Sequence, residues 1–202
     1  MELVISAVED VIVDSFEKNK YLSFPSQKIK AEDILRLVSE RVGGDFDKVE
    51  RIFVNMGPGS FTGIRASMAL VVGLVAGKNI DIVPFTSFDA LEYDILSAGQ
   101  ILAVNGFSNF VYVSYKKARK IVQECITIDD LIALSNQGNV VLSYSDKLLD
   151  QLSTAGAKIK KVRFSPEYAV QKFKQRKLEK IKFEPVYLRL SQAELQRKEN
   201  KL

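Results

Sequence analysis

The sequence predicts an α/β fold of two similar lobes, each built on a mixed sheet. Short strand-type apolar runs and helix-type apolar spacing follow one another along the whole chain of 202 residues. In the first half, three strands are followed by helices and strands in alternation, and a similar order starts again in the second half. Strands that alternate with helices favour mixed sheets covered by helices.

The first half opens with three short strands separated by polar turns such as 17–20. A helix is expected next, because apolar residues recur at helical intervals until Gly43-Gly44 end the pattern. The elements expected here are strands at 3–6, 11–16 and 21–24, a helix at 31–42, a strand at 51–56, a helix at 62–76, a strand at 80–84 and a helix at 87–97.

The second half repeats this order. The elements expected here are strands at 101–105, 110–115 and 121–128, a helix at 129–135, a strand at 140–143, a helix at 147–153, a strand at 158–164 and weaker helical patterning beyond it. We expect an N-terminal lobe at 1–98, a C-terminal lobe at 99–183, and a C-terminal helix at 184–202 that packs back on the first lobe. Paired βββαβα units are the architecture of actin-like, Hsp70-like and sugar-kinase-like proteins, which consist of two RNase-H-like lobes.

The composition excludes several kinds of site. The chain has no His and one Cys, so Ser-His-Asp triads, imidazole metal sites and disulfides are excluded, and no metal site is expected. The N-terminus lacks a signal-peptide pattern, and the longest apolar stretch, 64–76, is shorter than the ~20 residues that span a bilayer. We therefore expect a cytoplasmic protein with no membrane partner.

The net charge of +4 is unevenly distributed along the chain. Residues 158–182 hold ten Lys and Arg against two Glu, and the basic patch is assigned to Lys172, Lys174, Arg176 and Lys177. Such a patch can attract phosphates or an acidic partner. A solvated face without a ligand explains the same charge run, so both interpretations stay open.

A Gly-rich turn at 55–65 separates a buried strand from a helix, where backbone N–H groups can hold an anion. It matches neither the Walker loop, since no Lys follows, nor the dinucleotide fingerprint, since its last glycine comes one residue late. A tight strand-to-helix turn would need glycine in any case, and this alternative stays open. The residues assigned to an anion- or nucleotide-proximal turn are Gly57, Gly59, Ser60, Thr62, Gly63 and Arg65.

The helix that follows has small residues on one side. Ala66, Ala69, Gly73 and Ala76 recur every three or four residues, which lets another backbone approach closely. Apolar residues on the other sides indicate that the helix is covered nearly all round. A buried crossover helix and a docking helix explain this pattern equally well.

Several motifs together resemble the TsaB (YeaZ) family, the bacterial subunit of the tRNA threonylcarbamoyladenosine synthesis machinery. The motifs are Gly-Pro-Gly-Ser-Phe-Thr-Gly-Ile-Arg at 57–65, Val-Pro-Phe-Thr-Ser-Phe-Asp-Ala-Leu at 83–91, Val-Tyr at 111–112 and Glu-Pro-Val-Tyr-Leu-Arg at 184–189. The resemblance implies a two-lobed actin-like fold and a subunit that does not catalyse alone. It implies a TsaD-like partner, a TsaE-like ATPase, tRNA bound through the complex, and a homodimer when the chain is alone.

The resemblance also implies that pairing uses helices of the N-terminal lobe. The interface residues carried over are Ala31, Ile34, Leu35, Val38, Ala66, Ala69, Leu70, Gly73 and Ala76. No catalytic residue and no cofactor of its own are expected, and ATP or ADP is assigned to the interface of the complex.

The chain departs from the family pattern at three places. Ser-Ala-Val-Glu at 6–9 replaces the usual Asp-Thr-Ser, 30–32 lacks the usual His, and Asn-Gly-Phe at 105–107 replaces Asp-Ala-Arg. Each change removes an ionic or metal-binding group and favours a scaffold. The alternatives left open are a nucleotide-binding enzyme of the actin-like superfamily and a diverged homodimeric interaction protein with no role in tRNA modification.

Overall fold

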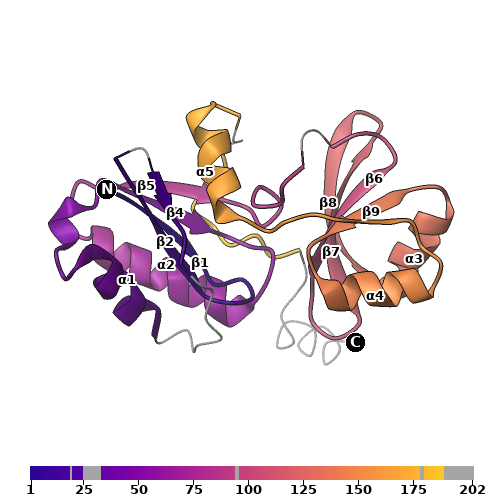
Figure 1. Cartoon of the computed structure of the whole chain (residues 1–202), viewed down its shortest axis with the longest axis horizontal. Helices are drawn as coiled ribbons and strands as arrows, with labels where there is room; N and C mark the ends of the chain where they lie inside the picture. Colours follow the sequence, from indigo (N-terminus) through magenta and orange to yellow (C-terminus); the bar gives the residue numbers. More distant parts are fainter. Residues whose placement is uncertain (19, 25–32, 94–95, 178–179, 189–202) are drawn as a thin grey trace, which may run out of the picture. The chain divides into compact units, whose positions relative to one another are not determined.

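The computed structural model describes residues 1–18, 20–24, 33–93, 96–177 and 180–188 (Figure 1). The chain forms two compact units, each described by itself below. The first comprises Met1–Asp94 and Val162–Pro185, and the second Ile95–Lys161 with Val186–Leu202. Residues 162–183, expected in a continuous C-terminal lobe, thus belong with the first unit. Of the expected helix at 184–202, residues 184–188 are not helical and 189–202 lie outside the described residues.

The first unit is built on a five-stranded mixed sheet in the order β3-β2-β1-β4-β5. β1 pairs antiparallel with β2 and parallel with β4, while β2–β3 is antiparallel and β4–β5 parallel. The central strands are almost fully buried, as expected for strands covered on both faces. The strands are β1 (Glu2–Ser6), β2 (Ile12–Glu17), β3 (Lys20–Leu22), β4 (Arg51–Asn55) and β5 (Asp81–Phe85).

Helices cover both faces of this sheet (Figure 1). α1 (Ile34–Val42) and α2 (Phe61–Val75) pack against each other and against β1, β2 and β4, with a short 3-10 turn, η2 (Phe46–Lys48), after α1. α5 (Pro166–Lys174) lies on the other face and contacts β1. One core cluster of the first unit, which includes two residues of α5, consists of Val4, Phe53, Phe85, Ala90, Ala169 and Val170.

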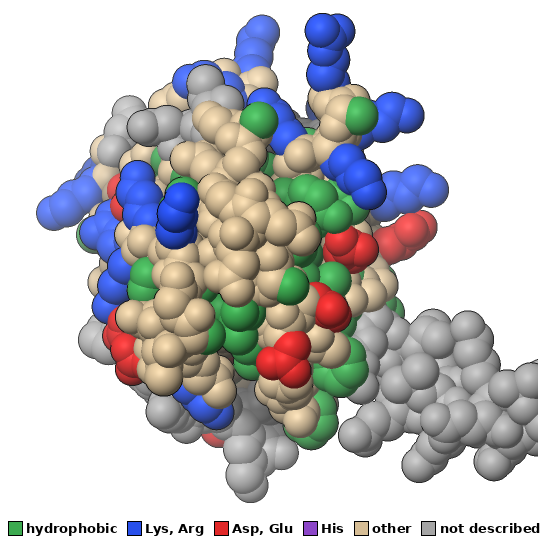
Figure 2. Space-filling view, turned by 90° about the vertical axis from the view of Figure 1, so that its right-hand side faces the viewer, with side chains coloured by type: hydrophobic (Ala, Val, Ile, Leu, Met, Phe, Trp, Pro, Cys, Tyr) green, Lys and Arg blue, Asp and Glu red, His purple; other side chains and the backbone are tan. Residues whose placement is uncertain are grey.

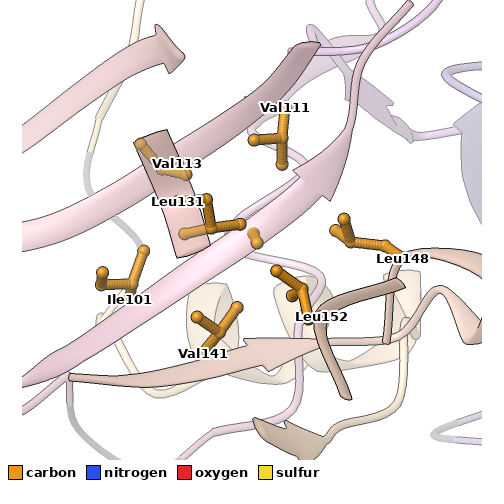
Figure 3. Close-up of a cluster of buried hydrophobic side chains, with 8 residues drawn as sticks. Ile101, Val111, Val113, Leu131, Val141, Leu148 and Leu152 are labelled. Carbon is orange, nitrogen blue, oxygen red and sulfur yellow. The ribbon is translucent and has the colours of Figure 1, made fainter. Parts of the chain in front are cut away.

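The second unit repeats the same sheet order, since β8-β7-β6-β9-β10 corresponds to β3-β2-β1-β4-β5. Its strands are β6 (Gln100–Asn105), β7 (Phe110–Lys117), β8 (Lys120–Thr127), β9 (Val140–Ser143) and β10 (Ile159–Lys161). Its helices are α3 (Ile128–Asn136) and α4 (Asp146–Thr154). Together they bury one core cluster, Ile101, Ala103, Val111, Val113, Leu131, Val141, Leu148 and Leu152 (Figure 3). Two such sheets are the paired RNase-H-like lobes of the actin-like fold, as the sequence predicts.

Two expected elements differ from the structure. The helix expected at 87–97 is wrong: the described part of this segment consists of turns and a single bridge from Leu91 to Phe164. The Asp89 carboxylate accepts hydrogen bonds from the backbone N–H and hydroxyl of Thr86, so the apolar side chains reach the core from a closed turn. The strand expected at 158–164 is also shorter and ends at Lys161.

The helix expected at 31–42 begins at Ile34 among the described residues, and Ala31 lies outside them. Within the described part of the chain, no helix is both long and apolar enough to cross a bilayer.

Candidate functional site

The Gly-rich turn is held by Asn55, a fully buried residue at the carboxyl end of β4. Its Oδ1 accepts hydrogen bonds from Gly57 N at 2.9 Å and Ser87 Oγ at 3.2 Å. Its Nδ2 donates to Ser6 Oγ, at the end of β1, at 3.2 Å. Because buried polar groups need partners, one side chain ties the ends of β1 and β4 to the segment after β5.

The three glycines of this turn are required for different structural reasons. Gly57 adopts a positive φ of 100°, which favours glycine. Gly59 and Gly63 are needed for close approach: a Cβ would lie 2.5 Å from Val8 Cβ in the first case and 1.8 Å from the Ala7 carbonyl oxygen in the second. The residues after β1 therefore fill the concave side of the turn, and the need for glycine is explained without a ligand.

Several N–H groups of the turn are already satisfied inside the protein. Ser60 N donates to Val8 O at 2.8 Å, and Gly63 N donates to Ser60 Oγ at 3.2 Å, which makes Ser60 the N-cap of α2. Thr62 and Arg65 are exposed on the first turns of the same helix. Anion binding by this turn stays a prediction, with fewer free donors than the sequence alone indicates.

Some of the apolar residues of α1 and α2 are buried in the first unit, and others are exposed to solvent. Ile34 and Val38 are 1% and 0% exposed, so these two predicted interface residues belong to the core of the first unit. Leu35 and Val72 are 52% and 54% exposed. The face that remains accessible, named here the α1–α2 apolar face, comprises Leu35, Ala69, Val72, Gly73 and Ala76, with Ala66 and Leu70 half-buried.

The predicted basic patch on α5 is partly absorbed by the fold. Lys172 is half-buried, with Nζ 4.5 Å from the ring centroid of Tyr93 and 4.7 Å from that of Tyr168, and burial lowers the pKa of Lys172. Arg176 and Lys177 follow the helix and are exposed. Lys174 forms an ion pair with Glu2 of β1.

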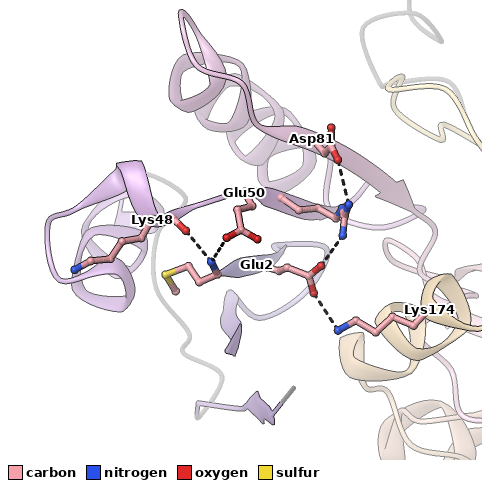
Figure 4. A network of polar contacts seen from close by, with 7 residues as sticks. Glu2, Lys48, Glu50, Asp81 and Lys174 are labelled. Atoms are coloured by element: carbon pink, nitrogen blue, oxygen red, sulfur yellow. Dashed lines mark hydrogen bonds and ion pairs between the residues drawn. The ribbon is translucent and has the colours of Figure 1, made fainter. Parts of the chain in front are cut away.

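Lys174 belongs to an ion-pair network that the sequence reasoning missed (Figure 4). Its Nζ lies 3.2 Å from Glu2 Oε2, and Glu2 Oε1 accepts from Arg51 Nη1 at 2.6 Å. Arg51 Nη2 donates to Asp81 Oδ2 at 3.1 Å. Glu2, Arg51 and Asp81 face each other in register at the starts of β1, β4 and β5. A signal was available, since opposite charges open three successive strands of the sheet.

A second missed residue is Asp14, a carboxylate on β2 that is only 1% exposed. Tyr21 OH donates to its Oδ2 at 2.6 Å, and Phe24 N donates to its Oδ1 at 2.9 Å. Burial raises the pKa of Asp14 despite these hydrogen bonds, and burial also raises the pKa of Tyr21. The pair is a structural anchor of the β2–β3 hairpin.

Metal ligands do not gather in the part of the chain that the structure describes. There, no group of three or more His, Cys, Asp or Glu side chains lies close enough to hold an ion. In the network of Figure 4, Glu2 and Asp81 are instead paired with Arg51 or Lys174, and Glu50 with the N-terminal amino group of Met1.

Comparison with known proteins places this geometry in a family. The family model described as TsaD, tRNA N6-adenosine threonylcarbamoyltransferase, matches residues 29–194, well over half of the chain. The chain belongs to this family. A curated relative, the tRNA threonylcarbamoyladenosine biosynthesis protein TsaB of Haemophilus influenzae, is 25% identical over 103 residues. That alignment covers 48% of this chain and 44% of the relative, so the chain matches less than half of the relative's length.

Solved structures agree on the fold. The YeaZ structure from Pseudomonas aeruginosa has a TM-score of 0.65 at 15% identity, covering 93% of this chain and 99% of that one. An uncharacterized protein similar to peptidase YEAZ, from the same organism, has a TM-score of 0.66 at 16% identity, with the same coverage. At these identities the likeness shows the fold alone. The resemblance to TsaB that the motifs at 57–65 and 83–91 predict is confirmed.

Proposed function

We propose that the chain is a non-catalytic partner subunit in tRNA threonylcarbamoyladenosine synthesis. In this proposal it supports a TsaD-like subunit in transferring threonylcarbamoyl to the adenosine beside the anticodon of tRNA, and a TsaE-like ATPase joins the complex. The cytoplasm, where tRNA is modified, is the expected location. When alone, the chain is proposed to form a homodimer through the surface that the TsaD-like partner would cover.

The observation that carries the proposal is the α1–α2 apolar face. Leu35 and Val72 expose more than half of their side chains although α1 and α2 pack on the sheet through their other sides. The small residues Ala69 and Gly73 are exposed on α2, and nothing lies within 4 Å of a Cβ built at Gly73. Exposed large apolar side chains beside small ones favour close helix packing from a partner.

A non-catalytic role is supported by the region beside the Gly-rich turn. The position where the family carries an Asp is occupied by residues of the Ser-Ala-Val-Glu segment. Ser6 there accepts a hydrogen bond from Asn55, and the backbone of Ala7 and Val8 approaches Gly63 and Gly59. A phosphate at this turn would need room and free donors that these contacts use.

Nucleotide binding is therefore assigned to the complex rather than to this chain. Gly57 N, Ser60 N and Gly63 N each donate within the protein, so the turn by itself fits a phosphate poorly. Exposed Thr62 and Arg65 could contact ATP or ADP that is held mainly by a partner. We propose no cofactor bound by this chain alone.

The test is to mix the full chain with the TsaD-like protein of the same organism and to measure the mass of the complex by light scattering. We expect Val72→Arg to weaken the mixed complex at least about tenfold, because it places a charge in a desolvated contact. Ile121→Arg is the matched control, since Ile121 in the second unit is 52% exposed. This control should leave complex formation unchanged.

Three outcomes would contradict the proposal. An unchanged complex with Val72→Arg would place the interface elsewhere. Formation of threonylcarbamoyladenosine by the partner proteins at full rate without this chain would remove its supporting role. Robust Mg-dependent ATP hydrolysis by the purified chain alone would show an enzyme instead of a scaffold.

A further inference from the structure

We propose that the turn of the β7–β8 hairpin, residues 116–120, binds the phosphate backbone of RNA. The turn reads Lys-Lys-Ala-Arg-Lys, and all five residues are exposed. Residues 95–161 contain eight Lys and Arg, of which this turn holds four. No ion pair joins these four to any other residue that the structure describes. Unlike Lys172 and Lys174 on α5, these cations are available to a ligand.

The equivalent hairpin of the first unit provides an internal comparison. There Glu17 on β2 lies directly opposite Lys20 on β3, which is an attractive pair. In the second unit Lys117 lies directly opposite Lys120, which is a repulsive pair at the same structural position. Because like charges opposite one another destabilise a hairpin, the second arrangement costs stability in the free protein. A polyanion bound at the turn would remove that cost.

The backbone conformation of the turn supports the same inference. Ala118 and Arg119 both have positive φ values, 48° and 67°, as in a tight turn that normally favours Gly, Asn or Asp. Arg119 occupies such a position at a conformational cost that glycine would avoid. As in the first hairpin, where Lys18 has a φ of 46°, a cation thus occupies a turn position where local stability favours a small residue.

Among the residues that the structure describes, the other turns at this end of the second sheet carry no acidic residue. Gln100 pairs with Val140, Val141 with Ile159 and Ile101 with Tyr115, so the turns before β6, β9 and β10 lie at the same end of the sheet as the hairpin turn. These turns, 97–100, 137–140 and 155–158, contain no Asp or Glu and add the exposed Lys158. β10 lies three strands from β7, about 14 Å away, so the positive surface spans several phosphates.

The opposite end of the same sheet is of mixed charge, since Lys147 follows Asp146 there and Lys161 pairs with Asp146. α3 and α4 begin there, with Asp129, Asp130 and Asp146 in their first turns. Figure 2, which faces the side of the second unit, shows Lys and Arg side chains projecting at the top of the view, and further Lys and Arg side chains on the left and near the bottom among Asp and Glu side chains. A sheet with unpaired cations at one end and mixed charge at the other orients a polyanion toward the basic end.

The occupant that fits best is an RNA backbone. Long, flexible Lys and Arg side chains on a narrow turn suit phosphates, which accept charged contacts without close apolar packing. A protein partner would require an apolar centre to the contact, and the hairpin end offers only Ala118 and the 52% exposed Ile121 beside four cations. The inference rests on the proposed function for the identity of the RNA, which would be tRNA.

The experiment measures binding of an unmodified tRNA transcript to the full chain at several salt concentrations. Lys117→Glu recreates the Glu–Lys pair of the first hairpin, so the variant should fold at least as stably as the original protein. We expect about tenfold weaker binding at 50 mM salt, and a salt dependence reduced by about one phosphate contact. Lys147→Glu, the same charge change on exposed Lys147 at the opposite end, is the matched control and should have little effect.

Lys117→Arg should retain the affinity, which would support a phosphate contact. Equal losses with Lys117→Glu and Lys147→Glu, or no loss with either, would overturn the inference. Binding to phosphatidylserine vesicles that depends on Lys117, with tRNA binding unaffected, would overturn it in favour of a membrane surface. Formation of threonylcarbamoyladenosine is measured separately: its absence in the unaltered complex would reject the proposed function while the direct RNA measurement still decides on the hairpin.

Discussion

Each unit has a hairpin at the same edge of its own sheet, β2–β3 in the first unit and β7–β8 in the second, but the two hairpins differ in burial and in charge. In each, a tyrosine hydroxyl donates to a carboxylate across the hairpin at 2.6 Å, Tyr21 to Asp14 in the first unit and Tyr115 to Glu124 in the second. Asp14 is buried, whereas the second pair is only partly buried. Both hairpins contribute buried residues to the core of their unit, but the turn of the second is exposed and carries four cations.

The same contrast holds at the turns that lead into the equivalent helices. β4 leads into α2 through the Gly-rich turn, whereas β9 leads into α4 through Tyr144 and Ser145 alone. Ser60 and Ser145 nevertheless cap the two helices in the same way, each accepting from the N–H three residues later. The shared strand order thus sets the backbone of both units. Local residues then give the first unit a close-packed Gly-rich turn and the second unit a charged hairpin turn.

The largest effect is expected at the Gly-rich turn, where the first unit differs most from the second. Gly63→Ala should lower the free energy of unfolding by about 3 kcal/mol, because the added Cβ would lie against the Ala7 carbonyl and the backbone must move. Urea denaturation at fixed protein concentration measures this loss. Gly73→Ala in the same helix is the control and should raise stability by about 0.5–1 kcal/mol, since its Cβ meets open space. Equal stability of the two variants would refute the close approach.

A smaller effect should separate the two basic segments. Lys174→Ala should lower the free energy of unfolding by about 1 kcal/mol, because it leaves Glu2, which is 13% exposed, with one cation fewer and removes the contact with the Phe16 ring. Lys117→Glu should instead raise it by about 0.2–1 kcal/mol by replacing a repulsive cross-strand pair. Thermal or urea unfolding of both variants tests the contrast. Destabilisation by Lys117→Glu would mean that the hairpin cations have a structural role.

The smallest expected effect is on the pH dependence of stability. Burial raises the pKa of Asp14 above its usual 3.8, so the folded state binds more protons than the unfolded state between these two values. The contribution of Asp14 to stability therefore falls as the pH rises from below 3.8 through the raised pKa. Asp14→Asn should remove this fall, as seen by urea unfolding between pH 3.5 and 7. Glu124→Gln, at the partly buried tyrosine–carboxylate pair of the second hairpin, is the control and should change the profile less.

Much of the fold could be predicted because the spacing of apolar residues along a short segment shows which side of that segment is buried. The strands and α1 to α4 follow from apolar spacing and end signals that neighbouring residues carry. The segment 87–97 misled the prediction, because its apolar residues pack from a turn closed by Asp89 and Thr86 rather than from a helix. The return of α5 to the first unit depends on contacts between distant residues, such as Lys174 with Glu2, that no local pattern encodes.

The candidate sites divide in the same way. The α2 half of the apolar face, with Ala69 and Gly73, could be predicted from spacing, whereas Ile34 and Val38 were assigned to the interface although they lie in the core. An apolar pattern shows which side of a helix avoids water, and it does not show whether the same chain or a partner covers that side.

By itself, the sequence determined the two repeated lobes, the family motifs and the exclusion of imidazole chemistry, since each depends on residue identity and short-range order. Only the tertiary structure decided which glycines admit a neighbouring backbone and which cations stay available to a ligand. Gly63 lies against the backbone of Ala7, and Lys174 forms an ion pair with Glu2. In both cases more than fifty residues of chain separate the two partners. Close packing and ion pairing both depend on how near two side chains lie in space. Strand order and register set the distances between residues that are far apart in the sequence.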